Sequence, residues 1–167
     1  MNLYLLRHGI AVEIAELDFA GDAARPLTPK GHRQLCKVAA AIRAMKIKFN
    51  AILSSPLVRT RQTTEVIAKE LKFKFQPAFS AELRPGGNAE KVIRHINALK
   101  PAPENLLLVG HEPDLSELLS LLVTGQAGGG FSFKKAGLAK LEVEKLSASK
   151  CATLAWLLTP AQMKLME

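Results

Sequence analysis

The chain has 167 residues, of which 48% are hydrophobic and 23% are charged, and its formal net charge is +8 at pH 7. This composition fits one globular domain with a sizeable core, and no apolar run approaches the ~20 residues that a membrane span requires. Residues 1–7 lack the basic leader of a signal peptide, so we expect a cytoplasmic protein without membrane contact.

The positive charge favours anions, which include phosphorylated substrates and nucleic acid, although simple solvation of the surface explains it equally well. Lysine and arginine are scattered, and aromatic residues make up only 5%, so nucleic acid is not favoured as a partner. Cys36 and Cys151 lie far apart without CxxC spacing, which argues against a disulfide framework and against a redox or metal role.

Short apolar runs alternate with helical patterns in the first half of the chain. Residues 2–7 are apolar and precede a glycine, as in a buried strand, whereas residues 10–27 lack periodicity and predict a loop. Thr28 then caps a helix that is expected to run to about Met45. The next expected elements are a strand over residues 50–54, a helix opened by Ser55-Pro56 that ends near Leu71, and an alternating edge strand over residues 73–76.

The second half continues this alternation. After a loop over residues 77–87, the pattern predicts a helix capped by Asn88 that ends near Leu99, a buried strand over 105–110, a helix from about Asp114 to Val123, a loop over 125–130, and strands near 137–144 and 151–158. Strands that alternate with helices predict an α/β fold in three layers, with a mostly parallel mixed sheet flanked by helices. At least one of the last two strands should be antiparallel. No repeat or linker divides the chain, so residues 1–167 are expected to form one domain.

Three segments place polar side chains just after predicted strands. Arg7-His8-Gly9 follows the first strand, Ser55 to Arg59 follows the second, and Gly110-His111 follows the strand over 105–110. Ligands of open α/β sheets lie beyond the carboxyl ends of the strands, so these segments should meet at one edge. Each of them alone is weak evidence, because a histidine at a strand end or an arginine on a helix is often only a polar surface residue.

Taken together, the two histidines and two arginines suit the transfer of a phosphoryl group. Arg7 and Arg59 offer forked donors that match phosphate oxygens. A neutral imidazole at His8 can attack phosphorus, and His111 can donate to the transferring group. The arginine charges should keep His8 neutral, and Gly9 leaves room for a phosphate to approach the backbone.

Metal binding is the main chemical alternative. His8, His111 and Glu112 contain ligand groups that zinc accepts. The chain has no HExxH motif, however, and two arginines would repel a divalent cation. Gly128-Gly129-Gly130 lacks the Lys-Ser/Thr that follows a phosphate-binding P-loop. We therefore expect neither a metal nor a cofactor.

Four segments, in the same order along the chain, resemble the motifs of the histidine phosphatase superfamily, which also includes the cofactor-dependent phosphoglycerate mutases. They are Leu6-Arg7-His8-Gly9, Leu27-Thr28-Pro29-Lys30-Gly31-His32-Arg33-Gln34, Ser54-Ser55-Pro56-Leu57-Val58-Arg59-Thr60-Arg61-Gln62-Thr63 and Val109-Gly110-His111. The resemblance spans residues 3 to about 120. Within the superfamily the chain is most similar to SixA-type phosphohistidine phosphatases, which lack the insertions of the mutases.

This resemblance implies a phosphoglycerate mutase-like sheet and a phosphohistidine intermediate on His8. It also implies that Arg7, Arg59 and His111 bind the phosphoryl group, with Gly9 and Ser55 as further members of the phosphate site. Arg61 is a less favoured candidate, because two residues further along a helix it should face elsewhere.

One departure from the mutase-like members concerns the leaving group. Those members carry a glutamate that protonates an alcohol, and the corresponding position here is Arg84 or Pro85. General acid catalysis contributes about 10²–10⁴-fold, so its loss should slow release of an alkoxide more than release of an imidazole, which already carries a proton near neutral pH. Glu82 and Glu112 remain alternative sources of the acid.

The sequence thus predicts a metal-independent phosphatase that removes phosphoryl groups from protein histidine, with a role in signal transduction. One alternative is a small-molecule phosphomonoesterase of the same superfamily. Another is a noncatalytic module that binds phosphorylated ligands, although simple anion binding would not need the nucleophile His8.

Overall fold

The computed structural model describes residues 1–16 and 21–166. Within them the sheet has six strands in the order β3-β2-β4-β1-β5-β6. The strands are β1 (Asn2–Arg7), β2 (Ala51–Ser54), β3 (Ala78–Phe79), β4 (Asn105–Gly110), β5 (Leu138–Val143) and β6 (Ala152–Leu158). The pairs β1–β4, β4–β2 and β2–β3 are parallel, whereas β5 and β6 add antiparallel ladders. The expected mixed, mostly parallel sheet is confirmed.

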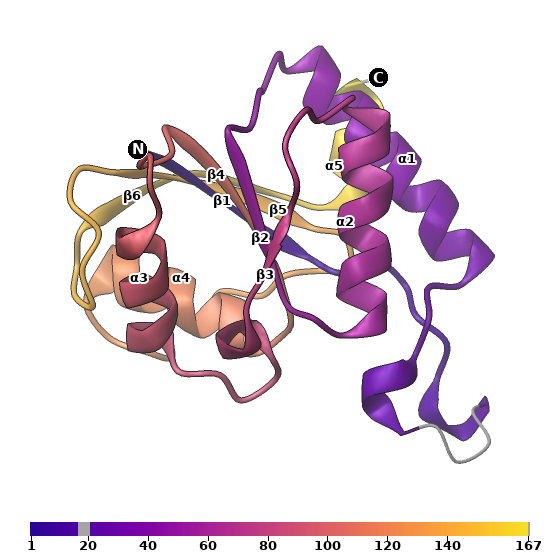
Figure 1. Ribbon diagram of the computed structural model, residues 1–167, viewed down its shortest axis with the longest axis horizontal. Coiled ribbons are helices and arrows are strands. Elements are labelled where there is room, and N and C mark those ends of the chain that lie inside the picture. Colours follow the sequence, from indigo (N-terminus) through magenta and orange to yellow (C-terminus); the bar gives the residue numbers. More distant parts are fainter. Residues whose placement is uncertain (17–20, 167) are drawn as a thin grey trace.

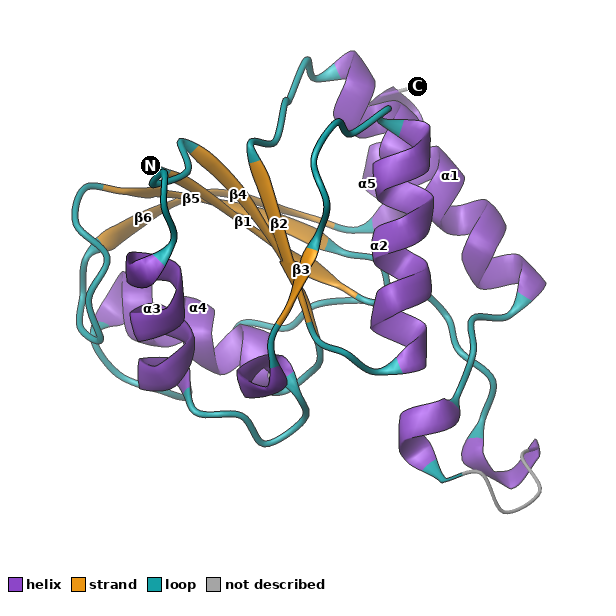
Figure 2. Cartoon of the chain, in the orientation of Figure 1, coloured by secondary structure: helices purple, strands orange, loops and turns teal. Residues whose placement is uncertain are grey.

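Helices cover both faces of this sheet (Figures 1 and 2). On one face lie α1 (Pro29–Ala44), α2 (Val58–Glu70) and the short α5 (Pro160–Met163), and on the other lie α3 (Ala89–Ala98) and α4 (Asp114–Thr124). Leu3 and Leu5 of β1 pack toward α3 and α4, and Tyr4 and Leu6 pack toward α1 and α2. Because both faces are covered, the strand is a continuous apolar run.

The two predicted helix caps are confirmed. The Thr28 hydroxyl accepts a hydrogen bond from the Gly31 N–H at 3.0 Å, and the Asn88 side chain accepts one from the Lys91 N–H at 3.1 Å. Each cap satisfies a backbone donor that the first turn of a helix leaves unpaired. In the described chain no helix combines the length and the apolar character that crossing a bilayer demands.

The edge strand predicted over residues 73–76 is wrong. The Phe73 N–H donates to the Ala68 carbonyl at 2.8 Å and Lys72 adopts a left-handed φ of 52°, so this segment still closes the end of α2. The strand that pairs with β2 comes later, at Ala78–Phe79. The alternation of residues 73–76 instead reflects Phe73, which packs against the core beneath α1 and α2.

Three other boundaries differ from the sequence prediction. The helix expected from Ser55-Pro56 begins at Val58, because the Ser55 N–H still pairs with the Val109 carbonyl of β4. Residues 17–20 of the expected loop over residues 10–27 lie outside the described part of the chain, and its described residues contain two 3₁₀ turns, Ile14–Glu16 and Asp22–Ala24. Helix α5 was not predicted, although Thr159 and Gln162 form a capping box at its start.

Candidate active site

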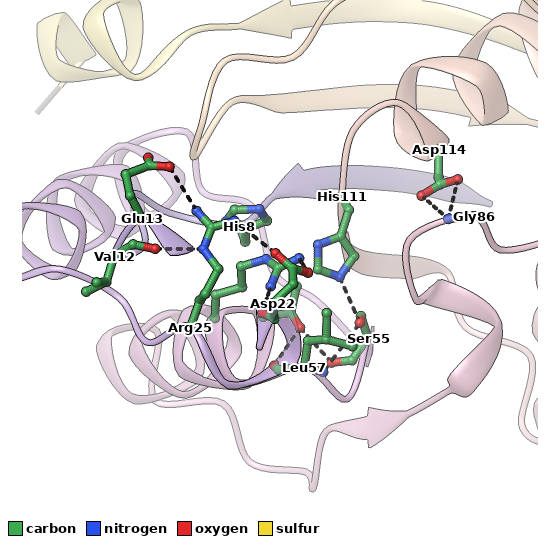
Figure 3. A network of polar contacts seen from close by, with 12 residues as sticks. His8, Val12, Glu13, Asp22, Arg25, Ser55, Leu57, Gly86, His111 and Asp114 are labelled. Carbon is green, nitrogen blue, oxygen red and sulfur yellow. Dashed lines mark hydrogen bonds and ion pairs between the residues drawn. The ribbon is translucent and has the colours of Figure 1, made fainter. Parts of the chain in front are cut away.

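Three of the predicted site residues lie at one edge of the sheet, each directly after the end of a strand. His8 follows β1, Ser55 follows β2 and His111 follows β4, and these three strands lie side by side in the order β2-β4-β1. The imidazole rings of His8 and His111 lie next to each other, with their centroids 5.2 Å apart and their planes tilted by 56° (Figure 3). Both are buried, with exposed fractions of 6% and 2%.

His8 is held as a neutral imidazole with a defined proton position. Its Nδ1 lies 2.7 Å from the Gly9 carbonyl oxygen. Because a carbonyl only accepts, Nδ1 carries the proton and Nε2 keeps its lone pair. Burial and the charges of Arg59, Arg7 and Lys135 together lower the pKa of His8 to about 4, against the opposing effect of the Gly9 hydrogen bond. At neutral pH the ring therefore offers an unprotonated Nε2.

Gly9 is required by packing. A Cβ at this position would lie 2.8 Å from Leu35 Cδ1 and 3.2 Å from Leu27 Cδ2. Its N–H donates to Thr63 Oγ1 at 3.1 Å, and that hydroxyl donates to the Arg59 carbonyl at 2.7 Å. The chain of hydrogen bonds ties the turn after β1 to the first turns of α2.

The two arginines reach the same edge from different elements. Arg7 ends β1 and its Nη1 donates to the Phe133 carbonyl at 2.7 Å. Arg59 lies in the first turn of α2, is only 4% exposed and contacts Asp22 with both terminal nitrogens. By contrast, Arg61 points away, as expected, because its Nε donates to the Pro56 carbonyl and its guanidinium lies 4.1 Å from the centre of the Phe79 ring.

His111 is fixed by one ring nitrogen. Its Nε2 lies 2.9 Å from Ser55 Oγ, and Ser55 is fully buried. Burial lowers the pKa of His111 to about 3, and the charges of Arg59 and His8 act in the same direction. His111 is therefore also neutral at pH 7.

Three buried nitrogens at this edge lack a hydrogen-bond partner among the described residues: Arg7 Nε, Arg59 Nε and His111 Nδ1. An unpaired buried donor costs about 1–3 kcal/mol, so such groups are normally satisfied in the functional state. A ligand rich in acceptor oxygens would pair with them. The arrangement thus combines a free imidazole lone pair at His8 with unpaired donors that suit an oxyanion.

Comparison with known proteins agrees with this chemistry. A model of the histidine phosphatase superfamily (branch 1) matches residues 3–85. The phosphohistidine phosphatase SixA of Escherichia coli (strain K12) is 26% identical over 166 residues, which cover 99% of this chain and 98% of that protein. The chain belongs to the histidine phosphatase superfamily. The phosphatases of this superfamily are hydrolases with a catalytic histidine, and phosphatase activity is supported for this chain.

Two further comparisons extend over most of this histidine phosphatase. An uncharacterized protein of Picosynechococcus sp. is 39% identical over 139 residues, which cover 83% of this chain and 82% of that protein. A solved structure of the protein histidine phosphatase SixA complexed with tungstate superimposes with a TM-score of 0.84 at 26% identity, covering 96% of this chain and 98% of that one. The predicted phosphoglycerate mutase-like fold is confirmed.

Two glutamates in this histidine phosphatase were candidates for a general acid, and the structure separates them. Glu112 accepts a hydrogen bond from the Ser116 N–H at 3.2 Å and so caps the start of α4. Glu82 lines a cavity of ≈ 60 Å³ together with His111 and Asp114. Arg84 and Pro85, which occupy the aligned position, are exposed. Of the two glutamates, Glu82 is the one that lines a cavity with His111, which Asp114 and Glu117 also line, and it remains a candidate.

Sequence reasoning missed Asp22 and Arg25, which belong to the segment expected to be only a loop. Asp22 contacts Arg59, and Arg25 Nη1 contacts Asp22 Oδ1 at 3.0 Å (Figure 3). Neither residue shows periodicity or a motif of known spacing. The available signal was the arrangement Gly21-Asp22 and Arg25-Pro26, which places opposite charges around a turn shortly after Arg-His-Gly.

Proposed function

We propose that this protein is a phosphohistidine phosphatase that hydrolyses phosphoryl groups from protein histidine through a phospho-His8 intermediate. The observation that carries the proposal is the state of His8. Its Nδ1 proton is committed to the Gly9 carbonyl, its low pKa keeps the ring neutral, and unpaired donors on Arg7, Arg59 and His111 surround it. A neutral imidazole among unpaired donors suits an attack on phosphorus.

In the first step the Nε2 lone pair of His8 attacks phosphorus in line, and the P–N bond of the substrate breaks. The leaving imidazole, which already carries a proton on its other ring nitrogen, keeps that electron pair and departs as a neutral imidazole. In the second step water attacks the phosphorus of phospho-His8, its proton passes to solvent, and inorganic phosphate leaves with His8 restored. Arg7, Arg59 and His111 bind the oxygens of the transferring group during both steps.

Ser55 has an indirect role in this scheme. For neutral His111 to donate through Nδ1, its Nε2 must accept a hydrogen bond. The hydroxyl of Ser55, 2.9 Å from Nε2, is in position to donate it. Gly9 contributes by letting the Arg-His-Gly turn pack against Leu35. We thus place Ser55 and Gly9 behind the groups that touch phosphate.

Similarity to SixA over the whole chain supports phosphohistidine as the substrate. The test is to label the protein with a phosphohistidine-containing protein and to measure phosphate release, with His8→Ala as the control. We expect acid-labile, base-stable phosphate on the wild type and none on His8→Ala. A wild type that binds the phosphoprotein but never becomes labelled or releases phosphate would indicate a noncatalytic module. Turnover should persist in EDTA, since the proposed steps use no metal.

A small-molecule phosphomonoesterase is the second candidate, and Glu82 favours it. A carboxylate that shares a cavity with His111 is placed to protonate an alcohol leaving group. Glu82→Gln separates the two functions. It should leave turnover of a phosphohistidine peptide nearly unchanged, whereas a monoesterase should lose activity toward glycerol phosphate. A wild type that strongly prefers the phosphomonoester would contradict our proposal.

A further inference from the structure

Among the described residues, one residue, Asp22, forms the hydrogen bonds of the Arg59 side chain, and the sequence analysis did not identify it. Its Nη1 donates to the Asp22 backbone carbonyl at 2.7 Å, and its Nη2 donates to Asp22 Oδ2 at 2.9 Å. Both acceptors belong to Asp22, which is 37 residues earlier in the chain. The Arg59 side chain is 4% exposed and that of Asp22 is 44% exposed, so the contact joins a buried guanidinium to a carboxylate at the rim of the site.

A guanidinium has two forked edges that can each bind an oxyanion with two N–H groups. The end edge consists of the two terminal nitrogens, and the side edge consists of Nε and one terminal nitrogen. Asp22 occupies the end edge of Arg59. Nε, which belongs to the side edge, is buried and has no partner among the described residues. The side edge of the Arg59 guanidinium is therefore the one that remains available to bind an oxyanion.

Asp22 is itself held in place. Arg25 contacts its other carboxylate oxygen at 3.0 Å, and Arg25 Nε donates to the Val12 carbonyl at 2.6 Å. Glu13 lies 3.6 Å from Arg25 and 3.5 Å from Lys135. Burial raises the pKa of Asp22, but hydrogen bonds and charges of Arg25 and Arg59 outweigh this and leave the pKa below its ordinary value. Asp22 is thus a charged anchor between two arginines (Figure 3).

We propose that Asp22 is a positioning residue for Arg59: it holds the end edge of the guanidinium so that the side edge with Nε faces the transferring phosphoryl group. This inference rests on the proposed function, because it assigns Arg59 to phosphate binding. It adds Asp22, which lies outside the four sequence motifs, to the residues that shape the phosphate site. It also distinguishes Asp22 from a carboxylate that merely competes with phosphate for Arg59.

Two substitutions separate position from charge. Asp22→Asn removes the charge but keeps a side-chain oxygen that can accept from Arg59 Nη2, whereas Asp22→Ala removes the charge and the side-chain acceptor; the backbone carbonyl that accepts from Nη1 remains in both variants. Glu13→Ala is the matched control, because Glu13 contacts Arg25 and Lys135 but has no contact with Arg59. Tungstate serves as a phosphate-like oxyanion in calorimetric titrations of the full chain. Thermal unfolding shows that each variant is folded at the temperature of the titration, and Asp22→Ser replaces the alanine variant if that one does not fold.

At metal sites, loss of a residue that orients a ligating side chain typically costs about 10–100-fold in affinity or activity, and we take the same scale for a residue that orients Arg59. We expect Asp22→Ala to weaken tungstate binding by about tenfold and to lower kcat by about tenfold, which is the low end of that range. Asp22→Asn should restore both toward the wild type, and Glu13→Ala should leave both unchanged. Tighter tungstate binding by both Asp22 variants would show that Asp22 is a competitor, and an alanine variant that matches Glu13→Ala would show that it has no role. Failure of the wild type to bind tungstate would instead overturn the phosphate site itself.

Discussion

The strand ends and the segment around Asp22 contribute to the same site in different ways. His8 and His111 follow strands in the middle of the sheet, and their surroundings are fixed by backbone ladders, as the hydrogen bond from the His8 N–H to the Gly110 carbonyl shows. Residues 21–25 are anchored mainly by side chains: Asp22 contacts Arg59 and Arg25. The comparison teaches that the two imidazoles lie on the sheet scaffold, whereas the orientation of the Arg59 side chain depends on residues 21–25, which lie outside the sheet.

Shortening a core side chain of the scaffold should have the largest effect on stability. Leu108 in β4 is fully buried and lies between Leu5 of β1 and Leu53 of β2. Leu108→Ala should lower the free energy of unfolding by about 2–5 kcal/mol, because it removes apolar contacts and leaves a cavity. Urea denaturation measures this loss.

Glu13→Ala is the variant to compare with Leu108→Ala. Glu13 lies in the connecting segment between β1 and α1, its side chain is 65% exposed, and its ion pairs are long. That variant should stay within about 0.5 kcal/mol of the wild type. Equal losses in the two variants would show that the connecting segment is as much a part of the cooperative core as the sheet.

Replacing the guanidinium of Arg59 should have the next largest effect, here on catalysis. Arg59→Lys keeps the positive charge but loses the guanidinium. In the wild type the two terminal nitrogens of that group contact Asp22, and its Nε is available for a ligand. Removal of one preorganised donor typically costs about 10²–10³-fold in kcat, and we expect a loss of that size with a phosphohistidine peptide. Arg61→Lys on the same helix is the control, because Arg61 binds Pro56 and Phe79 instead, and it should retain nearly full activity.

Acid should destabilise the scaffold side of the site through its neutral histidines. The pKa of His8 falls from 6.5 to about 4 on folding, so between these values the unfolded chain binds a proton that the folded chain does not. Stability from His8 is therefore complete above pH 6.5 and declines as pH falls toward 4. His111, with a pKa lowered to about 3, adds to the same decline.

At pH 5 the loss from His8 alone should be about 2 kcal/mol relative to pH 7. Urea denaturation of the wild type and of His8→Gln at pH 7 and pH 5 isolates this contribution, because glutamine does not titrate. The difference in stability between the two pH values should be smaller in the variant by this amount. An unchanged difference would mean that His8 is not held neutral in the folded protein.

The scaffold was the predictable part of this molecule. The apolar runs at β1 and β4 and the caps at Thr28 and Asn88 carry local signals, and the carboxyl ends of parallel strands must share one edge. His8, Ser55 and His111 could therefore be placed together before any coordinates were known. The position of the proton on His8, in contrast, follows from the hydrogen bond between Nδ1 and the Gly9 carbonyl, and no sequence pattern predicts this bond.

The unpredictable parts depend on contacts between distant residues. Asp22 meets Arg59 across 37 positions, and neither lies in a periodic pattern that would have paired them. The edge strand was misplaced for a related reason: the Phe73 N–H bonds to the Ala68 carbonyl at the helix end. Phe73 packs against the core while Phe75 is 63% exposed, so the alternation of the two rings does not reflect strand pairing. That Glu82 and His111 line the same cavity could be learned only from the structure.

The smallest effect should come from Ser55, which links the two strand ends without touching phosphate in our scheme. Ser55→Ala leaves Nε2 of buried His111 without its 2.9 Å partner, which should cost about 1 kcal/mol of stability. Without the hydroxyl, the Nδ1 proton of His111 is no longer selected, so kcat should fall, although by less than in Arg59→Lys. Ser54→Ala is a close control, because Ser54 is equally buried and its hydroxyl donates to the Ser55 carbonyl rather than to a histidine. If both variants lose stability alike and neither loses kcat, Ser55 is a packing residue and the proton on His111 is set by something else.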